Sequence, residues 1–280
     1  MIAATFVVLF SIVGICATEP TWTTLRVTWG LNVLSKHVYA KLPLTTSETA
    51  EYGFHEIREG CADGKFRGRR YIKDNDPAVI LIYDSKGFVA GIQSGLPIYE
   101  VDRVKTTYPF SSNPIFQLFD DTYFRTVYFM DPSYICKSNR TKKEFKNNIG
   151  TGLWIQNGSN PNVNLIKVPI KKDELKSTKW TKGKCFVSMG RHYWHDVKKD
   201  MSCDNFFPYF LLLNRGKLTG FGFASVGNFE FSTRFEHPKK QDFSKFFDPV
   251  PQCLENEFDQ TGGFSTMHVF FSVRAWNLAC

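Results

Sequence analysis

Short apolar runs separated by polar turn residues recur along the chain and predict β-strands. An apolar run at 80–83 is followed by Asp84-Ser-Lys-Gly87 and a second apolar run, and the run at 210–213 is followed by Asn214-Arg-Gly216 and another. Turn residues of this kind between apolar runs indicate a β-hairpin, because Gly readily adopts a positive φ. Apolar segments at 124–129 and 264–271 predict a closing strand after each hairpin.

Helix signals are fewer. Thr45-Thr46-Ser47 precedes Glu48 and Glu51, which is the pattern of a capped helix start, and Gly60 is the expected end of that helix. Lys171-Lys172-Asp173-Glu174 is a weaker counterpart in the second half. We therefore predict a strand-rich α+β fold in which each half runs as strand, short helix, hairpin, polar loop and closing strand.

Four segments of the first half resemble segments of the second half, and they occur in the same order. The pairs are 38–43 with 165–169, Gly68-Arg-Arg-Tyr71 with Gly190-Arg-His-Tyr193, 80–91 with 210–220, and 124–129 with 264–271. This order predicts a tandem duplication of two homologous repeats. We expect repeat 1 to span 18–136 and repeat 2 to span 151–280, joined by a polar, basic linker over 137–150.

The first 17 residues carry no charge, and their apolar core from Phe6 to Ile15 is too short to cross a membrane comfortably. Polar residues follow Ala17, so we predict a signal peptide over 1–17 and a secreted protein. An uncleaved membrane anchor is the alternative. Because no later uncharged apolar run approaches about 18 residues, we predict no transmembrane segment in the mature chain.

Six cysteines remain once Cys16 leaves with the predicted signal peptide. An even number in an exported chain indicates three disulfides. If both repeats share one framework, the pairs are Cys61–Cys136, Cys185–Cys280 and Cys203–Cys253, and pairing across the repeats is the alternative. Two sequons, which begin at Asn139 and Asn157, predict glycosylation in the same compartment.

Composition excludes a disordered chain, because 27 Phe and 11 Tyr among 280 residues are too many to leave in water. The formal charge of +8 is local: the segment 137–184 holds twelve basic and three acidic residues, so it carries +9 and the rest totals −1.

Such a segment predicts binding to anionic extracellular surfaces, either glycosaminoglycans or lipid head groups, and a merely solvated surface is the alternative. The candidate anion-binding residues are Lys142, Lys143, Lys171, Lys172, Lys182 and Lys184. Nucleic acid is the least supported partner, because the chain has neither an RNA-recognition signature nor a zinc-finger pattern.

Candidate chemistry concentrates in the second half. His192 replaces Arg70 of the first half, and His268 replaces a residue near Val127 or Tyr128. We predict a catalytic site there that consists of His192, His195, Asp196 and His268. In a strand, His192 would share a face with Trp194, and His195 would point to the opposite face. The alternative is that these histidines have packing roles only.

Known catalytic patterns are missing from the sequence. It contains no G-x-S-x-G elbow, no H-E-x-x-H and no P-loop, and no ligand set has zinc spacing. We therefore predict no metal, and no cofactor is indicated.

Two resemblances concern parts of the chain. Gly190-Arg-His-Tyr-Trp-His-Asp196, with Phe206-Phe-Pro208 and Thr266-Met-His268, resembles secreted animal proteins of no assigned activity. Tyr39-Ala-Lys-Leu-Pro43 and the hairpin around Gly87 resemble deoxyribonuclease II, a family that is also duplicated and secreted. Catalysis in that family uses a His-x-Lys pair in each half. None of the six His here is followed two positions later by Lys, so we transfer no nuclease activity.

Together these features predict an extracellular binding or interaction protein, such as a component of a venom, a secretion or a body fluid. One alternative is a secreted enzyme, hydrolytic or oxygen-dependent, with a His-centred site in the second repeat. Another is a carrier that holds a small apolar ligand in a pocket between the repeats. The sequence does not indicate an oligomeric state.

Overall fold

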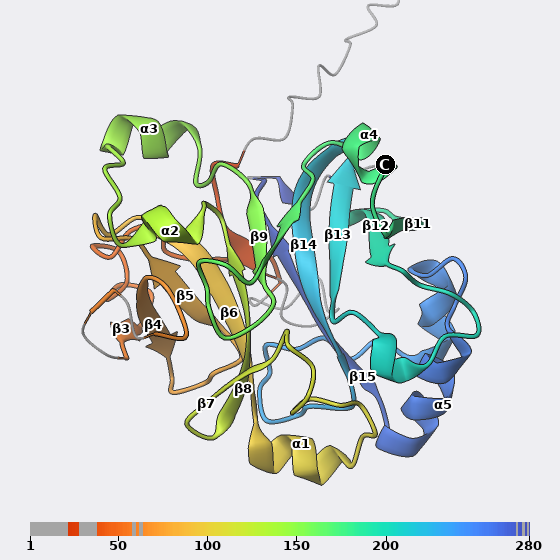
Figure 1. Ribbon diagram of the computed structural model, residues 1–280. Helices are drawn as coiled ribbons and strands as arrows, with labels where there is room; N and C mark the ends of the chain where they lie inside the picture. Colours follow the sequence, from red (N-terminus) through yellow and green to blue (C-terminus); the bar gives the residue numbers. More distant parts are fainter. Residues whose placement is uncertain are drawn as a thin grey trace, which may run out of the picture.

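Two antiparallel β-sheets form the framework of the protein in the computed structural model (Figure 1), which describes residues 22–27, 38–57, 60–61, 64–272, 274–275, 278 and 280. The predicted signal peptide lies outside the described residues. The first sheet contains β3 (Phe54–Glu56), β4 (Arg69–Lys73), β5 (Ile80–Tyr83), β6 (Val89–Pro97), β7 (Gln117–Phe119), β8 (Thr122–Tyr128), β9 (Leu153–Gln156) and β10 (Leu165–Val168). The second contains β1 (Arg26–Val27), β2 (Ala40–Lys41), β11 (Trp180–Phe186), β12 (Gly190–His195), β13 (Tyr209–Asn214), β14 (Lys217–Val226) and β15 (Phe264–Phe270).

Strand order shows that each sheet takes its last strands from the other half of the chain. The first sheet has the order β3-β4-β5-β6-β8-β9-β10, with β7 also paired to β8. The second has the order β11-β12-β13-β14-β15-β1-β2. Strands β1 and β2, from the predicted first repeat, therefore complete the second sheet, and β9 and β10, from the predicted second repeat, complete the first.

Helices are few and short. They are α1 (Ile98–Val104), α2 (Pro132–Ile135), α3 (Lys142–Asn147), α4 (Lys172–Leu175) and α5 (Gln252–Thr261), with 3₁₀ turns η1 (Cys203–Asn205) and η2 (Lys240–Lys245). None of the helices in the described part of the chain is long and apolar enough to cross a membrane.

The inner faces of the two sheets pack directly against each other. Phe129, just after β8, lies 6.5 Å from Phe221 of β14 between ring centroids. Arg125 of β8 is fully buried there, and its Nη1 donates to the carbonyl of Ala224 at 2.8 Å. Burial lowers the pKa of Arg125 to about 10. The core is therefore continuous across the two sheets, and one buried guanidinium ties them together.

The predicted hairpins and closing strands are confirmed. The turn at 84–87 joins β5 to β6, and the turn at 214–216 joins β13 to β14. Gly87 and Gly216 adopt φ of 80° and 76°, as these turns require. Strands β8 and β15 occupy the two predicted closing segments.

The helix predicted from Thr45 toward Gly60 is wrong. Glu48 does accept hydrogen bonds from the amides of Leu44 and Thr45, as a cap would. Four amides between 48 and 53 then donate to carbonyls three residues earlier, which makes successive turns. Gly53 has a φ of 76°, and Phe54 enters β3. Burial of Phe54 in the sheet outweighs the local helix signal. The weaker counterpart does form a helix, α4.

Three cysteine pairs lie at disulfide distance, and they are the three pairs that the sequence predicts. Their Cα–Cα distances are 5.5 Å for Cys61–Cys136, 6.0 Å for Cys185–Cys280 and 5.4 Å for Cys203–Cys253. The last pair joins η1 to α5. It therefore anchors the segment of η2 and α5, which covers the outer face of the second sheet.

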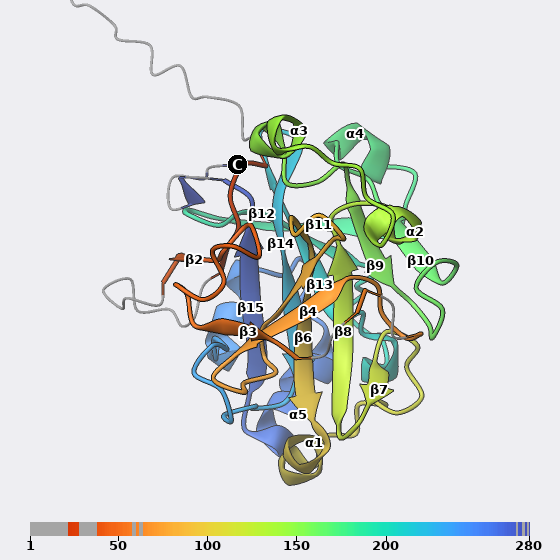
Figure 2. The same cartoon turned by 90° about the vertical axis from the view of Figure 1, so that its left-hand side faces the viewer.

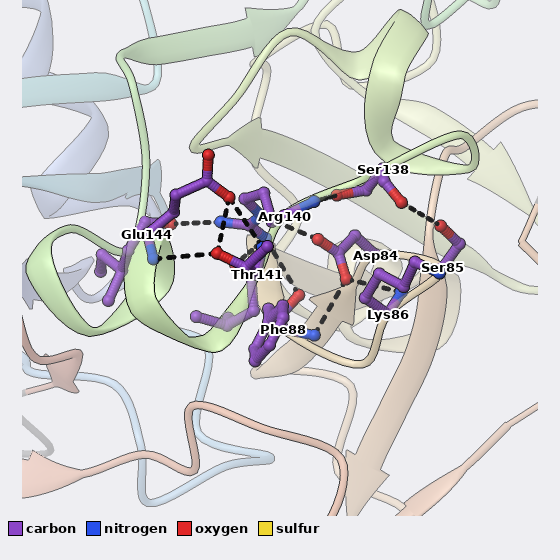
Figure 3. Close-up of polar contacts among 10 residues, drawn as sticks. Asp84, Ser85, Lys86, Phe88, Ser138, Arg140, Thr141 and Glu144 are labelled. Atoms are coloured by element: carbon purple, nitrogen blue, oxygen red, sulfur yellow. Dashed lines mark hydrogen bonds and ion pairs between the residues drawn. The ribbon is translucent and has the colours of Figure 1, made fainter.

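The segment between the predicted repeats is built into the fold (Figure 3). Arg140 forms an ion pair of 2.8 Å with Asp84, whose side chain is fully buried, and it also donates to the carbonyls of Phe88 and Val89. Thr141 and Glu144 form a capping box at the start of α3. The segment predicted as a linker therefore contains a helix and a buried anchor for the first hairpin.

Candidate functional site

His192 of β12 and His268 of β15 meet on the outer face of the second sheet. Their Nε2 atoms lie 3.4 Å apart, although β13 and β14 separate the two strands. The ring of Phe210 lies beside both imidazoles, and it occupies space above Gly222 that a Cβ at that position would fill. The structure thus brings together two of the predicted site residues.

Glu236 completes this cluster, and the sequence offers no signal that would have identified it. Its backbone pairs with that of Thr266 through two hydrogen bonds of 2.8 and 2.9 Å. This pairing aims the carboxylate at β15, where its Oε2 lies 2.6 Å from His268 Nδ1 and accepts from the Thr266 hydroxyl. Glu236, His268 and His192 therefore form one polar chain.

The proton positions in this chain follow from its partners. When Nδ1–H of His268 donates to Glu236, Nε2 of His268 is an acceptor that faces Nε2 of His192. Burial, and next the proximity of His268, lower the pKa of His192 well below its usual value. His192 is therefore neutral at physiological pH.

The polar chain of Glu236, His268 and His192 is sealed from solvent. His192, His268 and Glu236 are 1%, 3% and 1% exposed. Phe243, Phe246 and Phe247 line the roof of the cavity beside them, which has a volume of about 20 Å³. A cavity of this size holds about one water molecule. Phe246 is fixed by hydrogen bonds from the Lys184 amide and the Trp194 indole to its carbonyl. An organic substrate does not reach the imidazoles in this conformation.

His195 and Asp196 lie apart from this chain, so the predicted four-residue cluster does not assemble. Successive side chains of a strand point to opposite faces, and His195 accordingly packs against Trp180 and Phe207. Asp196 follows the end of β12 and pairs with Lys179 and Lys198 at 3.6 and 3.3 Å. Within the described residues, no group of three or more His, Cys, Asp or Glu is placed to hold a metal ion.

A larger hollow opens where the edges of the two sheets meet. It has a volume of about 730 Å³, within the range of roughly 300–1,000 Å³ that is typical of ligand pockets. We call it the edge cleft. One side is formed by β2 and the loop 231–234, and the other by β3 and the turn 73–77. Strands β2 and β3 are the edge strands of the two sheets, so residues of both sheets line the cleft. Figure 2 shows these strands on the same side of the molecule.

Arg234 builds the floor of the edge cleft. Its side chain is 4% exposed and pairs with Asp74 and Asp76 at 3.3 and 3.4 Å. It also donates to the carbonyls of Lys73 and Asp76, and Ser232 donates to Asp76 at 2.6 Å. The turn 73–77 is therefore held in place by the loop 231–234, which organises the cleft before any ligand binds.

The predicted anion-binding lysines are all exposed, but they do not form one patch. Lys142 and Lys143 lie on α3, and Lys171 and Lys172 lie at the start of α4. These two helices lie at the same end of the molecule in both views (Figures 1 and 2). Lys182 and Lys184 lie on the edge strand β11, and Lys184 pairs with Asp248 at 2.8 Å.

Comparison of the chain with protein-family models, with curated proteins and with solved structures finds no match.

Proposed function

We propose that the protein is a secreted, disulfide-bonded binding protein of two homologous repeats, whose ligand occupies the edge cleft. One observation carries this proposal: of the two cavities described above, the edge cleft of about 730 Å³ is the one large enough for an organic ligand, and residues of both sheets line it around the buried Arg234. The His192–His268 pair, by contrast, lies beside a cavity of about 20 Å³.

Matching strand registers support the duplication. In each sheet, one residue from each of four neighbouring strands pairs with the residue on the next strand, and these residues match between the two sheets. They are Arg70, Ile82, Gly91 and Tyr128 in the first sheet and His192, Leu212, Gly220 and Phe270 in the second. A register shift follows Ile82 in one sheet and Leu212 in the other. Apart from β7, strand order also corresponds, including the exchanged strands at the end of each sheet.

Glycines at corresponding positions support it further. Gly68 lies just before β4 and Gly190 is the first residue of β12, and their φ values are 96° and 95°. A Cβ on Gly91 or on Gly220 would collide with a carbonyl of the neighbouring closing strand. The same backbone requirement thus recurs at the same place in each sheet.

The same register supports Thr126, rather than Val127 or Tyr128, as the counterpart of His268. Arg70 donates to Gln93 at 2.7 Å, and Gln93 donates to Thr126 at 2.8 Å. This polar chain occupies the first-sheet positions that correspond to those of His192, Gly222 and His268. We infer that one ancestral polar chain diverged into two.

Secretion and glycosylation belong to the proposal. Three cysteine pairs at disulfide distance are compatible with an oxidising compartment. Asn139 is exposed just before α3, where a glycan would not disturb packing, and Asn157 follows β9. The exposed lysines of α3 and α4 support contact with an anionic extracellular surface. Retention on heparin that weakens with salt, and that is lost in Lys142→Glu/Lys143→Glu, tests this contact.

A His-centred enzyme is the second candidate, and the contact of 2.6 Å between Glu236 and His268 favours it. A carboxylate that orients an imidazole is a common arrangement for proton transfer. Activity there would require the segment 243–247 to move aside.

A ligand screen tests the edge cleft. We expect extracellular small molecules or oligosaccharides to raise the melting temperature of the wild type. Thr233→Trp fills the cleft from its exposed rim and should abolish that shift. Val187→Trp is the matched control, because Val187 is 79% exposed in the β11–β12 turn, away from the cleft. A screen without a stabilising compound, or hits that stabilise Thr233→Trp equally, would contradict the proposal.

A further inference from the structure

A second hollow adjoins the edge cleft on the outer face of the first sheet. It has a volume of about 310 Å³, and its lining includes Ile57, Phe119 and Phe124. The two hollows share Asn75, Pro77 and Tyr99. They therefore form one groove that passes over the turn 73–77 and around Tyr99.

Tyr99 stands at the junction of the two hollows with its ring in solvent. It is the second residue of α1 and is 62% exposed. A tyrosine this exposed presents an apolar ring face together with a hydroxyl that both donates and accepts. Further aromatic side chains line each hollow: Tyr52, Phe54 and Phe231 in the edge cleft, and Phe119 and Phe124 in the second.

The charges along the groove cancel. The basic lining residues are Lys41, Arg70, Lys73 and Arg234, and the acidic ones are Asp74, Asp76, Asp120 and Asp121. Lysine and arginine only donate hydrogen bonds, whereas ionised aspartate only accepts them. A lining with four of each does not select a strongly charged polymer. It suits a ligand whose polar groups both donate and accept, and hydroxyl groups do both.

We propose that the groove binds a neutral oligosaccharide, with one sugar ring stacked on Tyr99 and its neighbours in the two hollows. The inference rests on the proposed function, because it places one end of the oligosaccharide in the edge cleft. A sugar ring offers an apolar C–H face to an aromatic ring and a rim of hydroxyls to the charged side chains. Arg234 holds the turn that carries Asp74 and Asn75, so the polar groups are set before binding.

An extended peptide fits this groove less well. Peptides commonly add a strand to a sheet edge, and the strands beside the groove, β2 and β3, are only two and three residues long. They offer few backbone groups for such pairing.

The test uses the full secreted chain and immobilised neutral oligosaccharides of hexose and N-acetylhexosamine units, followed by calorimetry of the best binder at two lengths. We expect a longer chain to bind more tightly than its disaccharide, because only the longer chain passes Tyr99. Tyr99→Ala should weaken binding of the longer chain about tenfold. Tyr134→Ala should leave it unchanged, because Tyr134 is equally exposed, at 61%, on α2. In both views α2 lies away from α1 (Figures 1 and 2).

A second pair of variants separates the two hollows. Ile57 lines only the second hollow, so Ile57→Trp should remove the advantage of the longer chain and spare the disaccharide. Thr233→Trp should abolish binding of both. Three results would overturn the inference. The protein binds no neutral oligosaccharide, it binds peptides only, or Tyr99→Ala binds the longer oligosaccharide as tightly as the wild type does. The proposed function survives those results if Thr233→Trp still blocks some other ligand.

Discussion

His192 and His268 approach to 3.4 Å between their Nε2 atoms, although the strands that carry them are separated by two others. Their contact depends on Glu236, which orients His268 from a loop more than thirty residues earlier in the chain. The cluster is sealed, and so its first measurable consequences concern stability.

Truncation of Glu236 should destabilise the protein. Glu236→Ala leaves the buried Nδ1–H of His268 and the Thr266 hydroxyl without their acceptor. Loss of a buried partner costs about 1–3 kcal/mol, so the free energy of unfolding in urea should fall by that amount. Glu51→Ala removes an exposed carboxylate and is the control. Equal stability of the two variants would show that the buried contact contributes nothing.

Stability should decrease as the pH falls below about 6.5. Burial and the neighbouring His268 lower the pKa of His192 well below its usual value of 6.5. Below that pH the unfolded chain takes up a proton that folded His192 does not, so unfolding is favoured. His195, which is half-buried, acts in the same direction, because burial also lowers its pKa. Melting temperatures between about pH 7 and pH 5 should therefore fall, and His192→Gln should reduce the slope. His55→Gln, on an exposed residue of β3, should keep it.

The Asp84–Arg140 pair predicts a large stability loss when only one partner is removed. Asp84 is fully buried, so Arg140→Met leaves a charge in the core. Breaking a buried pair in this way costs about 3–5 kcal/mol. Adding Asp84→Asn to the same chain should recover part of that loss, since Asn214 opens the hairpin turn at 214–216 in the same way that Asp84 opens the turn at 84–87. Lys143→Met, exposed on α3, is the control for loss of a cation. Additive effects of the two substitutions in chemical denaturation would mean that the pair is not coupled.

Removal of the third disulfide should loosen the cover of the histidine cavity. The Cys203–Cys253 bond closes a loop with a sequence separation of 50, and the chain-entropy model gives about 4 kcal/mol for such a loop. Cys203→Ala/Cys253→Ala should lower the unfolding free energy and speed diethyl pyrocarbonate modification of His192 and His268. The double variant Cys61→Ala/Cys136→Ala should lower stability without that selective gain in reactivity. If both double variants react alike, the third disulfide does not hold the cover in place.

Local chemistry made much of the strand framework predictable. The turn residues at 84–87 and 214–216, each between two apolar runs, were enough to place β5, β6, β13 and β14. Four ordered similarities were enough to pair Cys61 with Cys136 and Cys185 with Cys280. The same reasoning failed at 45–60, where a local capping pattern was outweighed by burial of Phe54 in a sheet.

The sequence by itself determined the hairpins and the closing strands and predicted the cysteine pairs, because turn chemistry, apolar runs and internal similarity are properties of neighbouring or matching residues. Only the structure decided between those pairs and pairing across the repeats. Only the tertiary structure decided that Glu236 orients His268, that aromatic side chains seal the imidazoles, and that the edges of the two sheets enclose a cleft. These features arise where segments far apart in the chain meet, and no local pattern specifies which segments those are.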